Sequence, residues 1–247
     1  MNTENTDTMT FDLSKVKGII FDYGGTLDTG GDHWSIVIWN AYQKAGIAVS
    51  QPVFREAYVE AERELARARH ILPEHNFHDL LKIKMQLELQ WLSEQGHFPP
   101  AQVAAKSEEV AQYCYDSAKA QVEKAKPVLD TLKEKYPMVL VSNFYGNVES
   151  VLKDFGLDGY FKKIIESAVV GVRKPDPKIF ELGVKALGMH PEETVVVGDS
   201  YKKDIVPAES IGCQVLWIKG AGWTPEEDAQ THPNIVSDIE TVGSILG

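Results

Sequence analysis

Four residues that could handle a phosphoryl group stand at or near the ends of short apolar segments. Asp22 follows VKGIIF, Ser142 follows MVLV, Asp199 follows VVVG, and Lys174 lies in the segment RKPDP. A carboxylate can attack phosphorus, while a hydroxyl and an ammonium can hold phosphoryl oxygens. Two adjacent carboxylates repel each other unless a cation lies between them, and Mg²⁺ prefers oxygen ligands. The set predicts a Mg²⁺ site beside a phosphate clamp, with Asp22 able to form an aspartyl-phosphate.

Each of these residues has a more ordinary interpretation when it is taken alone. An Asp after an apolar strand usually belongs to a turn. Lys174 precedes a proline and would ordinarily be a solvated surface lysine. We therefore expect that removing Lys174 spares the fold, because an exposed lysine contributes little to packing. Only the four residues together indicate a site for phosphoryl chemistry.

The elements that must position these residues alternate between strand and helix. Apolar runs predict strands over 16–23, 138–141, 164–165, 194–197 and 213–218. Helical patterns predict helices over 128–135, 147–155, 177–187 and 204–211. This alternation predicts an α/β fold with a doubly wound, parallel, Rossmann-like sheet. Ligands bind at the carboxyl ends of the strands in such sheets, and we expect all four residues to stand at such ends.

The segment after the first strand has a different character, since some ninety residues show only helical patterns. Helices are predicted over 35–45, from Ser50 to about 70, from 77 to about 96, and after Pro99-Pro100. They predict an α-helical bundle inserted as a cap. We accordingly divide the chain into a disordered tail (1–10), an α/β core (11–31 and 126–247) and a helical cap (32–125).

Composition narrows the classes of function. The 247 residues carry 25 basic and 36 acidic side chains, a net charge of −11. A surface this negative repels nucleic acids and anionic membranes, so we expect neither as a partner. No apolar run is long enough to cross a bilayer, and no signal peptide is recognisable, so we expect a cytoplasmic protein.

Four segments occur in the order and at the spacing of a known family: FDYGGTLD (21–28), VLVSN (139–143), VRKPDPKIF (172–180) and VVVGDSYKKDI (195–205). Through them the sequence resembles the haloacid dehalogenase superfamily of hydrolases over nearly its whole length. The helical insert stands where the first-type cap of that family stands. The resemblance implies a Mg²⁺-dependent hydrolase of a small phosphorylated metabolite, working as a monomer or homodimer.

The resemblance also assigns roles on the phosphate side of the site. It implies that Asp22 is the nucleophile and that Lys174 neutralises both Asp22 and the phosphate. Ser142 and Asn143 would bind the phosphoryl oxygens. Thr26 would brace the loop after the first strand, close to the bound phosphate.

On the metal side, the resemblance implies three ligands and two supporting residues. Asp22, Asp199 and the backbone carbonyl of Gly24 would bind Mg²⁺. Asp204 and Ser200 would support the groups around the metal.

The sequence departs from the family at Gly24. Phosphatases of the family carry a second Asp at this position as general acid and base, dehalogenases carry Tyr, and phosphonatases carry Ala. Glycine has no side chain to move a proton. The retained metal residues disfavour dehalogenase chemistry, which needs no Mg²⁺. Asp28, Asp32 or His33 could fold back on the glycine-rich loop to replace the missing acid.

Two alternatives stay open beside a phosphatase. A phosphonate hydrolase-like enzyme would need a Schiff-base lysine in its cap; Lys44, Lys82 and Lys84 are available by type, and we expect each to be a solvated lysine on a helix face. A phosphate-ligand binding or regulatory protein with little turnover would need no acid at Gly24.

Overall fold

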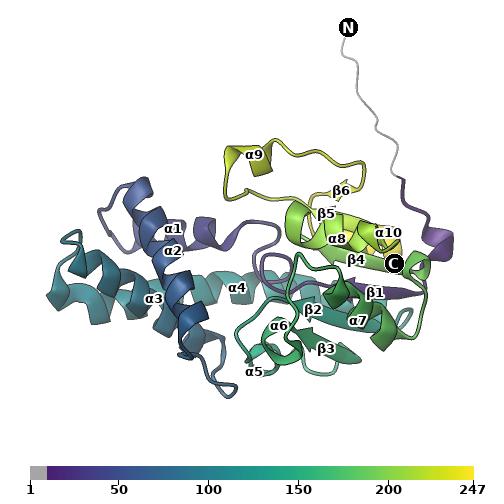
Figure 1. Cartoon of the computed structure of the whole chain (residues 1–247), viewed down its shortest axis with the longest axis horizontal. Helices are drawn as coiled ribbons and strands as arrows, with labels where there is room; N and C mark the ends of the chain where they lie inside the picture. The colour runs from purple at the N-terminus through teal and green to yellow at the C-terminus, as the bar shows by residue number, and fades with distance from the viewer. Residues whose placement is uncertain (1–9) are drawn as a thin grey trace, which may run out of the picture.

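A six-stranded parallel sheet forms the centre of the protein, as the computed structural model of residues 10–247 shows (Figure 1). The strands are β1 (Gly18–Phe21), β2 (Met138–Ser142), β3 (Lys163–Glu166), β4 (Thr194–Gly198), β5 (Gln214–Ile218) and β6 (Ile235–Val236). Their order in the sheet is β3-β2-β1-β4-β5-β6. The predicted doubly wound α/β fold is confirmed, and β1 lies between the two strands that also carry site residues.

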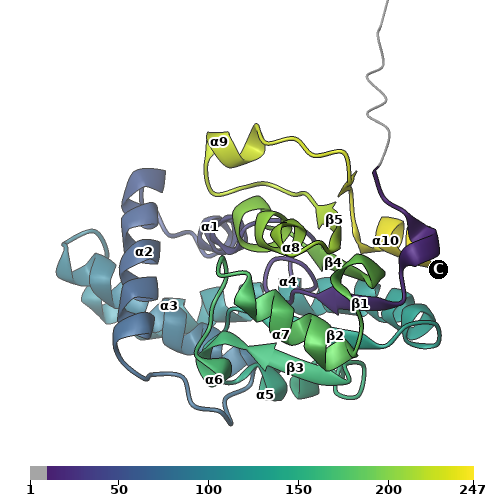
Figure 2. The same ribbon diagram turned by 45° about the vertical axis from the view of Figure 1, so that its right-hand side comes forward.

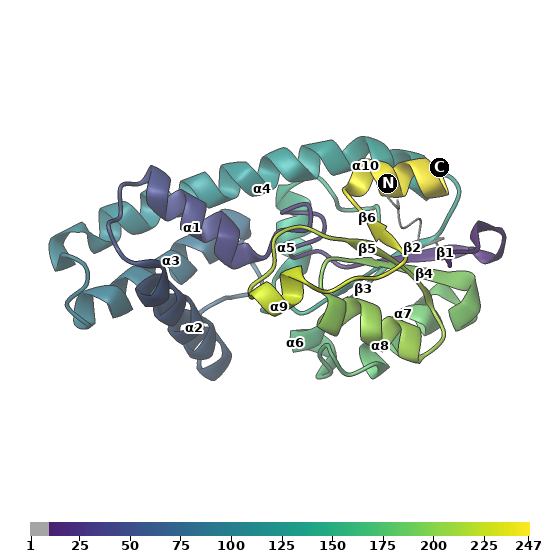
Figure 3. The same cartoon turned by 90° about the horizontal axis from the view of Figure 1, so that it is seen from above.

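Helices cover both faces of this sheet (Figure 3). One face carries part of α4 (Val103–Lys133), α5 (Val148–Asp154) and α10 (Ile239–Leu246), and the other carries α6 (Ser167–Val170), α7 (Lys178–Leu187) and α8 (Val206–Ser210). Alternate residues of β1 point to opposite faces: Ile19 and Phe21 pack in one apolar cluster, and Ile20 packs in the other. The near-continuous apolar runs of the strands follow from burial on both faces.

The predicted helical insert consists of α1 (Trp34–Lys44), α2 (Gln51–Arg67), α3 (Phe77–Glu94) and the first part of α4. It lies to one side of the sheet, beyond the carboxyl end of β1 (Figure 2). Asn76 and Asp79 form a reciprocal capping box that starts α3. No helix in the described part of the chain is both long and apolar enough to span a membrane.

The sequence-based helix over 128–135 proves wrong as a separate element, because α4 runs without interruption from residue 103 to residue 133. Pro127 lies inside α4, where a proline removes one backbone hydrogen bond and crowds the preceding turn. Buried Ala125 and Leu129 pack on either side of it and hold the helix together. The proposed boundary at residue 126 therefore falls within one helix that serves both cap and core.

Some other elements differ from the sequence-based expectation. The helix predicted over 204–211 begins earlier, as a wide turn over Tyr201–Ile205 that continues into α8. The short α9 (Pro225–Asp228), β6 and α10 were not predicted. Of the predicted tail, only Thr10 is among the described residues, and its backbone N–H donates to Asn234 Oδ1 at 3.0 Å.

Candidate active site

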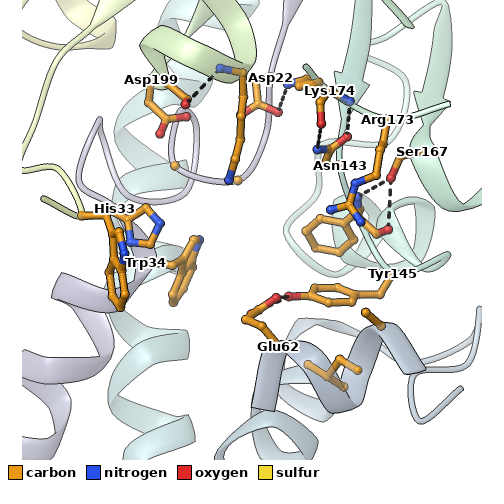
Figure 4. A pocket seen from close by; sticks show the side chains of 18 of the residues that line it. Asp22, His33, Trp34, Glu62, Asn143, Tyr145, Ser167, Arg173, Lys174 and Asp199 are labelled. Carbon is orange, nitrogen blue, oxygen red and sulfur yellow. Dashed lines mark hydrogen bonds and ion pairs between the residues drawn. The ribbon is translucent and has the colours of Figure 1, made fainter. Parts of the chain in front are cut away.

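Parallel pairing brings the predicted site residues to one edge of the sheet. Asp22 follows β1, Ser142 ends β2 and Asp199 follows β4, and β1 pairs with both β2 and β4. Asp22 and Asp199 line a cavity of about 1430 Å³, to which cap residues and core residues both contribute. Figure 4 shows Asp22, Asp199, Lys174 and Asn143 on the core side of this cavity.

Lys174 is held between two carboxylates. Its Nζ donates to Asp22 Oδ1 at 2.7 Å and to Asp204 Oδ1 at 2.6 Å. Burial opposes the charge, but Asp204 and Asp22 together raise the pKa of Lys174 above its ordinary value. Lys174 is only 4% exposed, so the expectation of a solvated surface lysine is wrong. The reason is that Asn143, which follows β2, holds the Lys174 backbone, and two carboxylates hold its ammonium.

The carboxylates of Asp22, Asp199 and Asp204 form a compact acidic cluster, with one oxygen of each within 4.8 Å of the others. Burial and the neighbouring carboxylates raise the pKa of Asp199, and burial raises the pKa of Asp204 against the effect of Lys174. One ammonium balances only one of the three charges. A divalent cation with oxygen ligands fits this cluster, because it would compensate the remaining two.

Gly25 allows the loop after β1 to approach this cluster. Its φ is +99°, and a Cβ atom there would lie 2.4 Å from Asp199 Oδ2. Only glycine combines this backbone conformation with the available space. Thr26 then places its hydroxyl 2.9 Å from Asp199 Oδ1 and 3.3 Å from Asp22 Oδ2. The hydroxyl therefore bridges the two carboxylates.

Two residues at the end of β2 lie near Lys174. Asn143 fixes the Lys174 backbone through paired hydrogen bonds, since its Oδ1 accepts the Lys174 N–H at 2.9 Å and its Nδ2 donates to the Lys174 carbonyl at 3.1 Å. Ser142 is 1% exposed, and its hydroxyl has no hydrogen-bond partner among the described residues. Ser200 donates its backbone N–H to Asp204 Oδ2 at 3.0 Å. The Ser142 hydroxyl is buried, and Ser142 is not among the residues that line the cavity.

Gly24 lines the cavity, and a Cβ atom placed on it would meet no atom within 4 Å. Of the three residues considered as a substitute acid, only His33 lines the same cavity. Burial lowers the pKa of His33 to about 4, so its ring is neutral at pH 7. Its Nδ1 accepts the Ser35 N–H at 3.2 Å, which leaves the proton on Nε2.

The two aspartates are directed elsewhere. Asp28 accepts hydrogen bonds from the Gly25 N–H at 2.7 Å and from Trp34 Nε1 at 3.1 Å, and it does not line the cavity. Burial raises the pKa of Asp28 to about 8. Asp32 accepts the Ala221 N–H at 2.8 Å. Both side chains therefore tie loops together in this structure.

The cap contributes a charged pair that the sequence interpretation missed. Lys84 of α3 ion-pairs with Glu62 of α2, and Tyr145 of the core donates its hydroxyl to Glu62 Oε1 at 3.0 Å. All three residues line the cavity (Figure 4 labels Glu62 and Tyr145). The expectation that Lys84 is solvated is wrong, since it is 4% exposed. The only signal in the sequence was the position of Lys84 among Leu80, Leu81 and Leu87. These neighbours do not show whether Lys84 faces the cavity or the solvent.

Comparisons with known proteins show which proteins this chain is similar to. The family model described as haloacid dehalogenase-like hydrolase matches residues 16–212. A glyceraldehyde 3-phosphate phosphatase from Pyrococcus furiosus is 28% identical over 84% of this chain and 82% of its own length. A phosphoserine phosphatase from Thermus thermophilus is 36% identical, over 35% of this chain and 34% of its own.

A solved structure shows the same fold. The Bacillus subtilis protein YfnB, bound to magnesium, superimposes with a TM-score of 0.57 at 18% identity, covering 94% of this chain and 99% of that one. The family model covers most of the chain and includes every residue of the acidic cluster. This chain belongs to the haloacid dehalogenase-like hydrolases.

Proposed function

We propose that the protein is a Mg²⁺-dependent phosphatase that hydrolyses monoesters of a small phosphorylated metabolite. The observation that carries the proposal is the charge arrangement on one cavity wall: three carboxylates lie together, and one buried ammonium, Lys174, pairs with two of them, Asp22 and Asp204. The names of the two phosphatases similar to this chain support a phosphate ester as substrate.

In this proposal Asp22 attacks phosphorus with a carboxylate oxygen. The bond from phosphorus to the ester oxygen breaks, the leaving group departs as an alkoxide or aryloxide that takes its proton from solvent, and an aspartyl-phosphate remains. Water then attacks this phosphorus, which releases inorganic phosphate and restores the Asp22 carboxylate. Lys174 binds Asp22 Oδ1, so among the described residues the other oxygen, Oδ2, has only the longer contact with Thr26. That oxygen is the better placed nucleophile.

The residues that would hold Mg²⁺ are Asp22, Asp199 and the Gly24 carbonyl. The ion would supply positive charge beside the phosphoryl oxygens. Asp204 would orient Lys174 and be held itself by the Ser200 N–H. Ser142 would donate its otherwise unpaired hydroxyl to a phosphoryl oxygen. Asn143 would keep the Lys174 backbone in place through its paired hydrogen bonds.

Phosphonate hydrolysis is the weaker alternative. A Schiff base needs a neutral amine, and Lys84 is the one of the three cap lysines that lines the cavity. Burial opposes its charge, but the Glu62 carboxylate raises the pKa of Lys84 well above its ordinary value. An ammonium held in this way is a poor nucleophile.

The test is phosphate release from aryl phosphates, alkyl phosphates and a phosphonate, with Mg²⁺ or with a chelator. We expect aryl phosphate hydrolysis that needs Mg²⁺ and is lost in Asp22→Asn. Asp32→Asn is the matched control, because Asp32 lies in the same connection between β1 and α1 but does not line the cavity. Release that survives chelation, or that persists in Asp22→Asn, would contradict the proposal.

A binding or regulatory protein is the rival function, and the missing side chain at Gly24 favours it. The two are separated by measuring inorganic phosphate binding alongside turnover in the same buffer. Binding that requires Lys174, without phosphate release from any ester, would support the rival. A missing general acid typically costs about 10²- to 10⁴-fold in rate, so slow but measurable turnover supports the phosphatase.

A further inference from the structure

Lys84 presents an unused hydrogen-bond donor at the cavity wall. Its side chain is 5% exposed, and its ammonium makes one hydrogen bond, to Glu62. The Tyr58 ring covers another side of the ammonium, with its centroid 4.3 Å from Nζ. An ammonium has three donors, so at least one of them has no protein acceptor among the described residues. A ligand atom that meets this donor must be an acceptor.

The charge of Lys84 is already balanced. Burial opposes ionisation of Glu62, yet Lys84 and the Tyr145 hydroxyl lower its pKa, so the pair is an ammonium and a carboxylate at neutral pH. An anionic ligand group would put a second negative charge beside Glu62, and the single charge of the buried Lys84 cannot balance both. Such a group is costly to accommodate in a buried place. The acceptor that fits Lys84 is therefore uncharged.

Glu62 adds a second requirement, because it can only accept hydrogen bonds. A ligand group that touches both side chains must accept from Lys84 and donate to Glu62. A hydroxyl does both, whereas a carbonyl or ether cannot donate, a carboxylate repels Glu62, and an ammonium cannot accept. The Glu62 side chain is 36% exposed, so one side of it is reachable from the cavity.

The position of the pair relative to the core is set by Tyr145. This residue follows Asn143 in the loop after β2 and donates its hydroxyl to Glu62 at 3.0 and 3.1 Å from the two carboxylate oxygens. Figure 4 shows Glu62 and Tyr145 across the cavity from Asp22 and Lys174. A substrate whose phosphate lies against Asp22 would extend its alcohol portion towards the pair.

We propose that Glu62 and Lys84 bind a free hydroxyl on the alcohol portion of the substrate, so that the preferred substrates are phosphate monoesters of polyhydroxy alcohols. This inference rests on the proposed phosphatase function. It makes Glu62 and Lys84 specificity-determining residues of the cap. They take no part in breaking the phosphate ester bond.

The experiment measures kcat/KM for three matched series over a range of chain lengths: ω-hydroxyalkyl, alkyl and ω-carboxyalkyl phosphates. One hydrogen bond to a charged group corresponds to a change of roughly 10- to 100-fold in kcat/KM. At one chain length, kcat/KM of the hydroxyl member should therefore exceed that of the alkyl member by this factor. The carboxylate member should be the poorest. Equal kcat/KM values for the hydroxyl and alkyl members at every chain length would overturn the inference. A preference for the carboxylate member would also overturn it, and would indicate that the exposed Arg173 binds the substrate instead.

Variants of the pair sharpen the test. Lys84→Met should lower kcat/KM for the hydroxyl member to the level of the alkyl member. Glu62→Gln removes the balancing charge, so the carboxylate member should gain relative to the hydroxyl member. Lys82→Met is the matched control on the same helix, because Lys82 pairs with Glu108 at 2.9 Å and does not line the cavity. An unchanged preference in well-folded Lys84→Met would contradict the inference.

The wild-type series decides the question even if the variants fail to fold. The same assays also distinguish an error in this inference from an error in the proposed phosphatase function. Without Mg²⁺-dependent hydrolysis of aryl phosphates, the proposed function itself is wrong. With that hydrolysis but no hydroxyl preference, only the assignment of Glu62 and Lys84 is wrong.

Discussion

The two walls of the cavity carry similar charged groups, but their charges are balanced differently. On the core wall, Asp22, Asp199 and Asp204 outnumber the single Lys174. On the cap wall, Lys84 and Glu62 neutralise each other. An excess of buried negative charge requires a cation and favours chemistry at a dianionic group, whereas a neutral pair with a spare donor favours recognition.

The difference shows how one cavity separates reaction from selection. Asp22 and Asp199 directly follow paired strands that fix their positions, so they can hold a reacting group in a defined place. The cap residues come from helices, and their contact with the core passes through side chains such as Tyr145. Changes on the core wall should therefore affect rate and stability, and changes on the cap wall should affect the choice of substrate.

The largest expected effect is the loss of rate and stability in Lys174→Met, compared with Lys84→Met. Lys174→Met should lower kcat by about 10³-fold or more. It should also destabilise the fold by about 3–5 kcal/mol, because Asp22 and Asp204 stay buried without their cation. Lys84→Met should destabilise less, since Glu62 has access to water. Denaturant unfolding and steady-state kinetics measure both. Equal loss of stability in the two variants would remove the distinction between the walls.

A smaller effect is expected from Gly24→Asp, which adds the side chain that family phosphatases carry. Space is available for a Cβ at this position, so the fold should tolerate it. A general acid helps a poor leaving group most, so turnover of alkyl phosphates should rise by about 10-fold or more relative to aryl phosphates. Gly24→Asn controls for size. If Gly24→Asp is neutral and His33→Ala slows the enzyme, His33 already supplies the missing function.

The smallest effect concerns Glu88, a buried cap residue outside the cavity. Burial raises its pKa to about 7, and Tyr42 donates its hydroxyl to Glu88 Oε2 at 3.0 Å. Between about pH 4.5 and 7 the folded state holds more protons than the unfolded state, so stability falls as pH rises through this window. Glu88→Gln should remove this contribution to the pH dependence of stability. It should also raise the free energy of unfolding by about 1–3 kcal/mol at pH 8. The exposed Glu94→Gln is the control, and identical pH profiles for Glu88→Gln and wild type would contradict the account.

The core wall could be predicted from the sequence because topology does most of the positioning. Asp22, Ser142 and Asp199 follow recognisable strands, and parallel strands end at the same edge. The burial of Lys174 was not predictable, since no residue pattern shows that Asn143 holds its backbone and two carboxylates hold its ammonium. The same is true of Lys84, whose burial depends on how α3 is rotated against α2. Helix α4 continues through Pro127, because burial of the residues before and after it outweighs the tendency of proline to end a helix.

The proposed mechanism requires covalent phosphorylation of Asp22. The most direct measurement is acid quenching during turnover of an aryl phosphate with Mg²⁺, followed by mass spectrometry of the peptide that contains Asp22. Because no aspartate stands at position 24 to activate water, the intermediate should accumulate. The account predicts one added phosphoryl group on Asp22, absent in Asp22→Asn and increased in wild type relative to Gly24→Asp. Turnover without any phosphorylated Asp22, under conditions where chemistry limits the rate, would contradict it.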